Sequence, residues 1–377
     1  MNIAGLVFSN IHDRTIPEMT RMRTMASIPF GCRYRLIDFA LSNMVNSDIT
    51  NIGVITHYNY QSLMDHIGGG KDWDLARRSG GIKILPPYIT AYENAAAAKL
   101  YTSRLEALCG AKNFISRCNA DYIVLSDCDT VLNIDLNAVM EDHIRSGAFL
   151  TLVTKRMKVA DQQFTHERDI AVVDENDRIT EIDRYIPKEG ELDISTNIMV
   201  MRRTDLQASL DEALARGYTS FHRDIIGRNL SKKLFHAYRF DGWYSQIDSL
   251  DSYFSTSMQL LTPEARRCLF GDPEREIYTK IRNSAPAKYA EDASVSNSLI
   301  ADGCVIEGTV ENSILFRGVH VGRGTVIRNS ILLQDTFVGT NVTLNCVITD
   351  KNVSIRNDRI LSGHTSMPFF IGKAITV

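Results

Sequence analysis

Two carboxylates near the middle of the chain are the strongest candidates for chemistry. Asp127 and Asp129 follow the apolar run from Tyr122 to Leu125, which is typical of a buried strand. In open α/β sheets, ligands bind at the carboxyl ends of the strands. Carboxylate oxygens suit a hard divalent cation, and this spacing lets both side chains reach one cation if the turn brings them together. A solvated turn that holds no metal explains the same residues equally well.

A second group of candidate residues is basic. Arg33 and Arg35 lie next to Gly31, whose missing side chain allows a ligand to approach the backbone. Arg21 and Arg23 precede them in the sequence. Guanidinium groups bind phosphate and carboxylate groups through paired N–H donors. The pattern is compatible with a turn that faces an anion, but for Arg33 and Arg35 taken alone, pairing with surface carboxylates is the more common explanation.

The elements expected to hold these residues alternate between strand and helix. The run from Ile3 to Phe8 is compact and apolar, as in a buried parallel strand. An apolar helix from Leu36 to Asn43, a strand from Ile52 to Thr56 and a helix that contains Leu63 and Ile67 follow it. This βαβ order predicts an α/β, Rossmann-like domain with a mostly parallel sheet.

The pattern changes at about residue 294, where short repeats begin. Apolar residues then recur at a spacing of six, with glycine or asparagine between them. The series includes Ile314, Val326, Leu332, Val338 and Leu344, and His320 is the exception in it. Such a period is typical of a left-handed parallel β-helix, whose coils bury apolar rows by stacking. Cys304 and Cys346 are expected to face inward or to pack. We predict an α/β domain over residues 1–261, a linker over 262–293 and a β-helix over 294–377.

Composition and charge narrow the class of protein. The chain has 377 residues, of which 44% are hydrophobic and 23% are charged, as in an ordinary globular protein. A net charge of -3 gives no basic face for nucleic acid, and no apolar run has the length of a membrane span. The seven cysteines are scattered without CxxC spacing, so neither a disulfide framework nor a zinc site is expected. We expect a cytoplasmic protein with no nucleic-acid or membrane partner.

The segment from Ile28 to Asn43 reads IPFGCRYRLIDFALSN. It resembles the PFGGKYRxIDFxLSN signature of bacterial ADP-glucose pyrophosphorylases, which are nucleotidyltransferases that make ADP-glucose for glycogen from ATP and glucose 1-phosphate. The similarity continues through Asn46 to Ile49 and Val54 to Tyr58, and it resumes weakly later. The resemblance covers nearly the whole chain, and it implies a nucleotidyltransferase domain followed by a β-helix that makes subunit contacts.

Three positions depart from the catalytic members of this family. Their first strand ends in a glycine-rich turn, GGxGxRL, that cradles the triphosphate, whereas residues 9–15 here read SNIHDRT. Alignment on the PFG anchor places Thr15 at the arginine of that turn, with Arg14 as an alternative one residue away. The same alignment places Met25 at the lysine of the family's RAKPA segment. The WxDVGTxDxY segment reads YSQIDSLDSY, which places Gln246 at the second magnesium ligand. Each change removes charge that would act on the phosphates, so we expect no catalytic residues at these positions.

Two other positions are retained. Asp127 matches the family aspartate that holds magnesium, and Ser195 matches a serine that contacts glucose. The resemblance implies that both are substrate-binding residues and that Asp127 is a vestigial metal ligand. Magnesium would serve the assembled enzyme, and no cofactor is assigned to this chain.

The combined pattern implies a non-catalytic, regulatory subunit of the GlgD type. Such a subunit would join a catalytic ADP-glucose pyrophosphorylase subunit in a hetero-oligomer, with a heterotetramer as the expected form. The resemblance also makes the four arginines candidates for a sugar-phosphate effector site; they are Arg21, Arg23, Arg33 and Arg35.

Two alternative functions stay open from the sequence. The chain could be an active glucose-1-phosphate adenylyltransferase that uses Asp127 with a rearranged loop. It could also be a metal-dependent sugar-nucleotide glycosyltransferase, because Asp127 and Asp129 form the DxD pattern of that class. The motif at residues 28–43 and the β-helix favour the pyrophosphorylase family over the glycosyltransferases.

Overall fold

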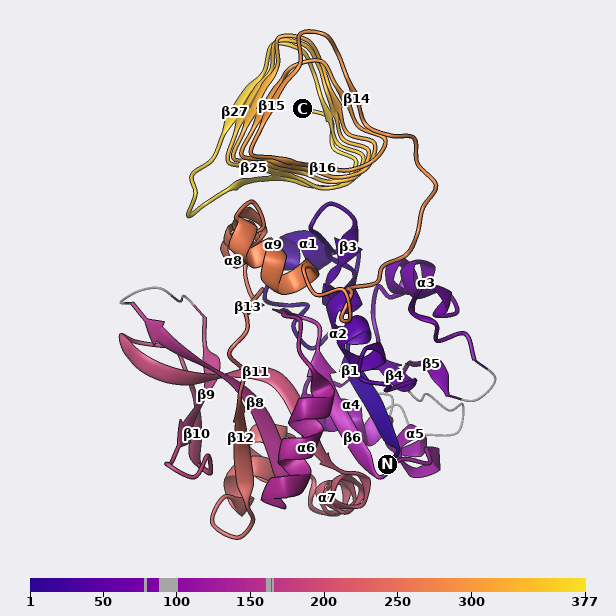
Figure 1. The fold of residues 1–377 in the computed structure, drawn as a ribbon, viewed down its shortest axis with the longest axis vertical. Coiled ribbons are helices and arrows are strands. Elements are labelled where there is room, and N and C mark those ends of the chain that lie inside the picture. The colour runs from indigo at the N-terminus through magenta and orange to yellow at the C-terminus, as the bar shows by residue number, and fades with distance from the viewer. Residues whose placement is uncertain (78–79, 88–100, 161–163, 165) are drawn as a thin grey trace.

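The computed structural model describes residues 1–377 except 78–79, 88–100, 161–163 and 165 (Figure 1). Figure 1 shows an α/β domain and, beside it, a β-helix of triangular cross-section. Both parts of the predicted fold class are therefore confirmed.

A nine-stranded sheet forms the centre of the α/β domain. Four strands pair in parallel in the order β5-β4-β1-β6, so the predicted parallel sheet is confirmed in this half. Strand β11 runs antiparallel to β6 and adds an antiparallel part that also contains β8, β9 and β10. The bounds are β1 Ile3–Phe8, β4 Asn51–Ile55, β5 Gly81–Leu85, β6 Tyr122–Asp127, β8 Leu150–Val159, β9 Arg168–Val173, β10 Ile179–Tyr185, β11 Gly190–Arg202 and β12 Phe235–Arg239.

Helices cover both faces of this sheet because its strands are apolar on both sides. Leu6 and Phe8 of β1 pack with residues of α4, α5 and α7. Val7 points to the other face and packs with residues of α2 and α6. The bounds are α2 Leu36–Val45, α3 Gln61–Ile67, α4 Arg104–Gly110, α5 Lys112–Arg117, α6 Leu136–Ser146 and α7 Arg203–Arg216.

The β-helix has three five-stranded parallel sheets. Each strand pairs with its equivalent in the next coil, as predicted for stacked repeats. The first sheet contains β14 Lys288–Tyr289, β17 Val305–Ile306, β20 His320–Val321, β23 Phe337–Val338 and β26 Ser354–Ile355. The second contains β15 Ser294–Ser296, β18 Thr309–Glu311, β21 Val326–Arg328, β24 Thr343–Asn345 and β27 Ile360–Ser362. The third contains β16 Leu299–Ile300, β19 Ile314–Leu315, β22 Ile331–Leu332, β25 Val347–Thr349 and β28 Phe369–Ile371.

The spacing of six predicts the interior residues only in part. Ile314, Ile331 and Ile348 are successive partners in one ladder, and their numbers differ by 17 rather than 18. Each of these coils is one residue short of three hexapeptides, so the apolar series shifts by one position per coil. Leu332, Val338 and Leu344 lie in the interior as predicted, whereas the interior positions near His320 and Val326 belong to Val321 and Ile327.

The third sheet of the β-helix faces the α/β domain. We call the contact between this sheet and the α/β domain the seam. Ile314 and Ile331 pack in the seam with Phe30, Tyr253 and other apolar residues of the domain. Leu315 and Leu332 of the same sheet fill the β-helix interior, so the central strands are buried on both faces.

The segment predicted as a linker contains regular structure. Within residues 262–293, α9 spans Pro263–Phe270 and its Leu269 packs in the seam. Strand β14 pairs in parallel with β17 and so belongs to the β-helix before residue 294. The helix before this segment is α8, Leu250–Gln259. Within the described ranges, no helix is long and apolar enough to span a membrane.

Candidate functional site

The strand order places the two candidate carboxylates at the edge of the sheet. Asp127 is the last residue of β6, which is paired in parallel with β1. The next strand, β7 (Thr130–Val131), pairs with β13 (Ser245–Gln246), and this pairing sets Gln246 opposite Thr130. The side chains of Asp127 and Asp129 are almost fully buried. The carboxyl end of the sheet therefore brings Asp127, Asp129 and Gln246 together.

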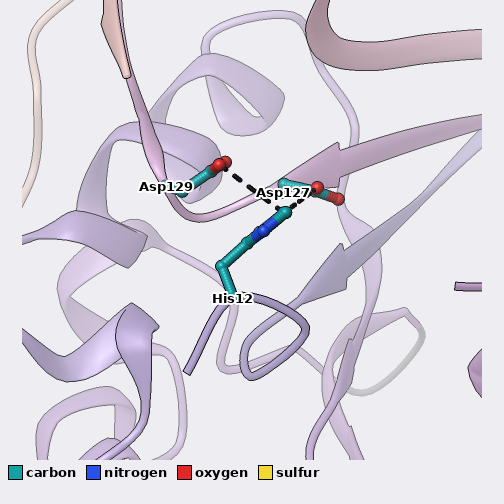
Figure 2. Close-up of side chains that lie close together, drawn as sticks. All are labelled: His12, Asp127 and Asp129. Carbon is teal, nitrogen blue, oxygen red and sulfur yellow. Dashed lines mark hydrogen bonds and ion pairs between the residues drawn. The ribbon is translucent and has the colours of Figure 1, made fainter. Parts of the chain in front are cut away.

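Asp127 forms ion pairs with two basic side chains. Its Oδ2 lies 2.5 Å from Nη2 of Arg104 and 2.7 Å from Nε2 of His12, which is also 3.5 Å from Asp129 (Figure 2). Burial opposes protonation of His12, but Asp129 and Asp127 outweigh burial and raise the pKa of His12 to about 9. Burial also disfavours the Asp127 carboxylate, but Arg104 and His12 hold its pKa below the usual range. The cluster is therefore an internal network of opposite charges.

Gln246 is the centre of an adjoining network. Its Nε2 donates a hydrogen bond to Oδ2 of Asp129 at 2.6 Å, and its Oε1 accepts one from Arg168. The hydroxyl of Tyr244 donates to the same Oε1 at 3.2 Å. Arg168 also donates to Asp248 at 2.6 Å. Both ends of the Gln246 amide are thus engaged by neighbouring side chains of the chain itself.

A cleft of about 580 Å³ opens above these networks. Thr15 lines this cleft, and its hydroxyl donates to the carbonyl of His12 at 2.8 Å, so the loop of residues 9–15 folds back on itself. The other lining residues include His12, Arg104, Asp169, Arg184, His222 and Gln246. The cleft is large enough for a small organic ligand.

Ser195 and Met25 are buried in different places. Ser195 lies in β11, is 3% exposed, and accepts a hydrogen bond at 3.1 Å from the backbone N–H of Asn197. Asn197 has φ of +61°, a left-handed conformation that asparagine tolerates. Met25 is 1% exposed and its side chain packs in the seam, while its backbone N–H donates to Asp13 at 2.6 Å.

Magnesium, which the resemblance implies for catalytic members, does not fit this set of side chains. Ligand atoms of His12, Asp127 and Asp129 lie within 4.8 Å of one another, as in a cation site. A hard divalent cation, however, requires about six oxygen ligands and carboxylate charge. Arg104 and His12 already neutralise that charge, and Gln246 adds none. Oδ1 of Asp127 is buried without a hydrogen-bond partner, which leaves one carboxylate oxygen for an ion.

The four arginines of the predicted anion site do not share one environment. Arg23 is 3% exposed, and its Nη2 binds both carboxylate oxygens of Asp350, at 2.7 and 2.8 Å, across the seam. Arg35 is buried and donates to the carbonyl and the hydroxyl of Ser62, at 2.5 and 2.9 Å. Arg33 and Arg21 are exposed.

Two of these arginines line a basic recess at the seam. Arg33 and Arg35 come from the α/β domain, and the β-helix supplies two further cations. Burial, together with the nearby cations Arg35 and Arg23, lowers the pKa of Lys351 to about 7. The basic side chains that line this recess are Arg33, Arg35, Lys280, Arg282, Arg317 and Lys351, and no carboxylate is among its lining residues in the described parts of the chain.

The sequence reasoning missed the residues that complete both networks. His12, Arg104 and Arg168 lie far apart in the chain, and no recognised motif contains Arg104 or Arg168. His12 lies within the segment of residues 9–15, but nothing in the sequence marked it as a partner of Asp127. The sequence contains only an indirect signal for these residues. If the carboxylates of Asp127 and Asp129 are buried without a metal ion, basic side chains from elsewhere in the chain must balance their charge. Sequence spacing alone does not identify which arginine or histidine supplies them.

The fold and the carboxyl-edge site define a nucleotidyltransferase-like protein with a hexapeptide β-helix. A family model described as nucleotidyl transferase matches residues 16–203, and one described as GlmU-like, C-terminal hexapeptide matches residues 285–363. The chain is 32% identical to the glycogen biosynthesis protein GlgD of Bacillus subtilis over 373 residues, which covers 98% of this chain and 96% of the relative.

Glucose-1-phosphate adenylyltransferases match over a similar length. The enzyme of Fervidobacterium nodosum is 32% identical over 367 residues, which covers 96% of this chain and 86% of the relative. The enzyme of Bacillus thuringiensis is 29% identical over 351 residues, which covers 92% and 91%. The chain belongs to the family of the glucose-1-phosphate adenylyltransferases and GlgD, as the motif at residues 28–43 predicts.

Proposed function

We propose that this chain is a non-catalytic, modulatory subunit of an ADP-glucose pyrophosphorylase in glycogen biosynthesis. The observation that carries the proposal is the engagement of Gln246, whose amide lies between Asp129 and Arg168. Transfer of an adenylyl group needs cationic charge on the phosphates, held by free carboxylates. At this edge the carboxylates are bound to the chain's own side chains. The similarity to GlgD supports the same interpretation.

The partner would be a catalytic ADP-glucose pyrophosphorylase subunit in a hetero-oligomer, with a heterotetramer as the expected form. Magnesium would then serve the catalytic subunit. The seam recess would bind a sugar-phosphate effector through Arg33 and Arg35, with Lys351 and Arg282 beside them. Several cations around one recess suit an anion with more than one charged group. Arg23 would support this site from behind, since its guanidinium is held by Asp350.

The test measures pyrophosphate release from ATP and glucose 1-phosphate with magnesium. The full chain is assayed alone, mixed with the catalytic subunit of the same cell, and mixed with an inactive catalytic subunit that still folds. We expect release only with the active partner, at a rate or effector response that the chain changes. Substantial release by the chain alone, or with the inactive partner, would refute the non-catalytic role. An active partner that neither binds the chain nor responds to it would refute the modulatory role.

The two alternative functions have less support. An active adenylyltransferase would need Asp127 to be available for the substrate's metal ion, but Arg104 and His12 are bonded to it. A sugar-nucleotide glycosyltransferase would need both Asp127 and Asp129 for a manganese ion, and Asp129 is bonded to Gln246. Manganese-dependent binding of a nucleotide sugar by the isolated chain would favour the glycosyltransferase.

A further inference from the structure

Arg104 and His12 approach the carboxylate pair from two separate parts of the chain. Arg104 is the first residue of α4, and His12 lies in the loop that follows β1. Both contact Oδ2 of Asp127. Figure 2 shows that His12 also reaches towards Asp129. Nη2 of Arg104 also donates to the side-chain carbonyl of Asn197 at 3.2 Å. These contacts tie together β6, β11, α4 and the loop of residues 9–15.

Arg104 and His12 lie where a metal ion would bind between the carboxylates of the Asp127–Asp129 cluster. The ligand atoms of His12, Asp127 and Asp129 cluster within 4.8 Å, with Nε2 of His12 hydrogen-bonded to one carboxylate and 3.5 Å from the other. The side chain of Arg104 is 12% exposed and that of Asp127 is 0% exposed, so water screens their attraction poorly. A divalent ion at the cluster would meet the fixed positive charge of Arg104 within a few ångströms.

We propose that Arg104 is a resident counterion that closes the Asp127–Asp129 cluster to divalent metal ions, with His12 hydrogen-bonded to the same carboxylate. Arg104 can take this role because its guanidinium keeps its charge at every physiological pH. The inference rests on the proposed function and deepens it, since it gives a physical reason why this cleft is not catalytic. The cleft of this chain can then hold only ligands that bind without a bridging metal ion.

Removing Arg104 is expected to expose a latent metal site. A neighbouring charge shifts the ionisation of a carboxylate by roughly 10- to 1000-fold, and an incoming cation experiences a comparable effect. Arg104→Met keeps the aliphatic length of the side chain but removes the charge. We therefore expect Mn²⁺ affinity to rise by at least roughly tenfold in Arg104→Met, with Asp127 and Asp129 as ligands.

The experiment titrates Mn²⁺ alone into the full-length chain and follows free Mn²⁺ by electron paramagnetic resonance. The matched control is Arg184→Met, because Arg184 lines the same cleft and pairs with Asp169 at 3.1 Å instead of Asp127. We expect no saturable binding by the unchanged chain or by Arg184→Met, and binding by Arg104→Met that is lost in Arg104→Met/Asp127→Asn. Arg104→Gln replaces Arg104→Met if the latter does not fold, with the same expected result.

Saturable Mn²⁺ binding by the unchanged chain that Asp127→Asn removes would overturn the inference. No gain in a folded Arg104→Met or Arg104→Gln variant would also overturn it. These results are independent of the proposed function. A chain that binds Mn²⁺ but releases no pyrophosphate refutes only the counterion inference, whereas a chain that excludes Mn²⁺ but releases pyrophosphate refutes only the non-catalytic role.

Discussion

The ion pair between Arg23 and Asp350 gives the sharpest test of how the two parts of the chain are held together. Its side chains are 3% and 5% exposed, and both carboxylate oxygens accept from one guanidinium nitrogen. Asp350→Asn keeps the shape of the side chain but leaves the charge of Arg23 buried without a counter-charge. Arg35 and Lys351 lie close enough to repel that charge.

The magnitude follows from the burial of this pair. Breaking a buried ion pair by removing one partner costs about 3–5 kcal/mol. Unfolding entropy of about 2.1 cal/mol/K per residue gives about 0.8 kcal/mol/K for a chain of 377 residues. Asp350→Asn should therefore lower Tm by about 4–6 °C if the chain unfolds in one transition.

Differential scanning calorimetry of three variants checks this expectation. Glu311→Gln breaks the exposed pair between Glu311 and Arg328, whose side chains are 36% and 53% exposed, and should cost less than about 1 kcal/mol. The double variant Arg23→Met/Asp350→Leu removes both charges and should recover most of the loss in Asp350→Asn. A Tm of Asp350→Asn within about 1 °C of the unchanged chain would refute the reasoning. A double variant as unstable as Asp350→Asn would also refute it.

Four further predictions concern the seam recess and the β-helix. The pKa of Lys351 is about 7 in the folded chain and about 10.4 in an unfolded chain, so the ligand-free protein should gain stability as pH rises from about 7 to 10. Binding of a sugar bisphosphate, which needs the Lys351 ammonium, should weaken over the same rise, and calorimetric titrations at pH 6 and 8.5 measure this change. Arg33→Ala should weaken that binding by roughly tenfold, since a hydrogen bond to a charged group is worth about 1.5–3 kcal/mol. Arg21→Ala should have no effect on the binding, because Arg21 does not line the recess. Leu332→Ala, at a fully buried interior position, should cost about 2–5 kcal/mol in chemical unfolding.

The sequence predicts the fold well because its patterns reflect local periodicity. The run from Ile3 to Phe8 forms an internal strand of the sheet, and the repeats after residue 294 form the β-helix. The register inside the β-helix is less predictable, since a coil one residue shorter moves the interior position from Val326 to Ile327. Local apolar spacing does not reveal this shift, because Val326 and Ile327 are both apolar.

The candidate site is predictable only where a motif marks it. Asp127 and Gln246 are found from the strand end and the family segment, and the strand pairing brings them to one edge. Arg104 and His12 complete the site, but in the sequence they lie 23 and 115 positions away from Asp127. Such contacts depend on the tertiary arrangement. For the same reason, the sequence does not predict the ion pair between Arg23 and Asp350, which are 327 positions apart.

The burial of the third β-helix sheet on both faces bears on how the chain opens by local unfolding. A free β-helix can fray coil by coil from its last repeat, because each coil contacts only its neighbours. Here β19, β22 and β25 also pack against the α/β domain. The strands of the second sheet, in contrast, carry exposed residues such as Ser296 and Ile360. Backbone amides along the seam should therefore exchange with solvent deuterium more slowly than those on the opposite side of the same coils. The β-helix is thereby protected unevenly around its circumference as well as along its axis.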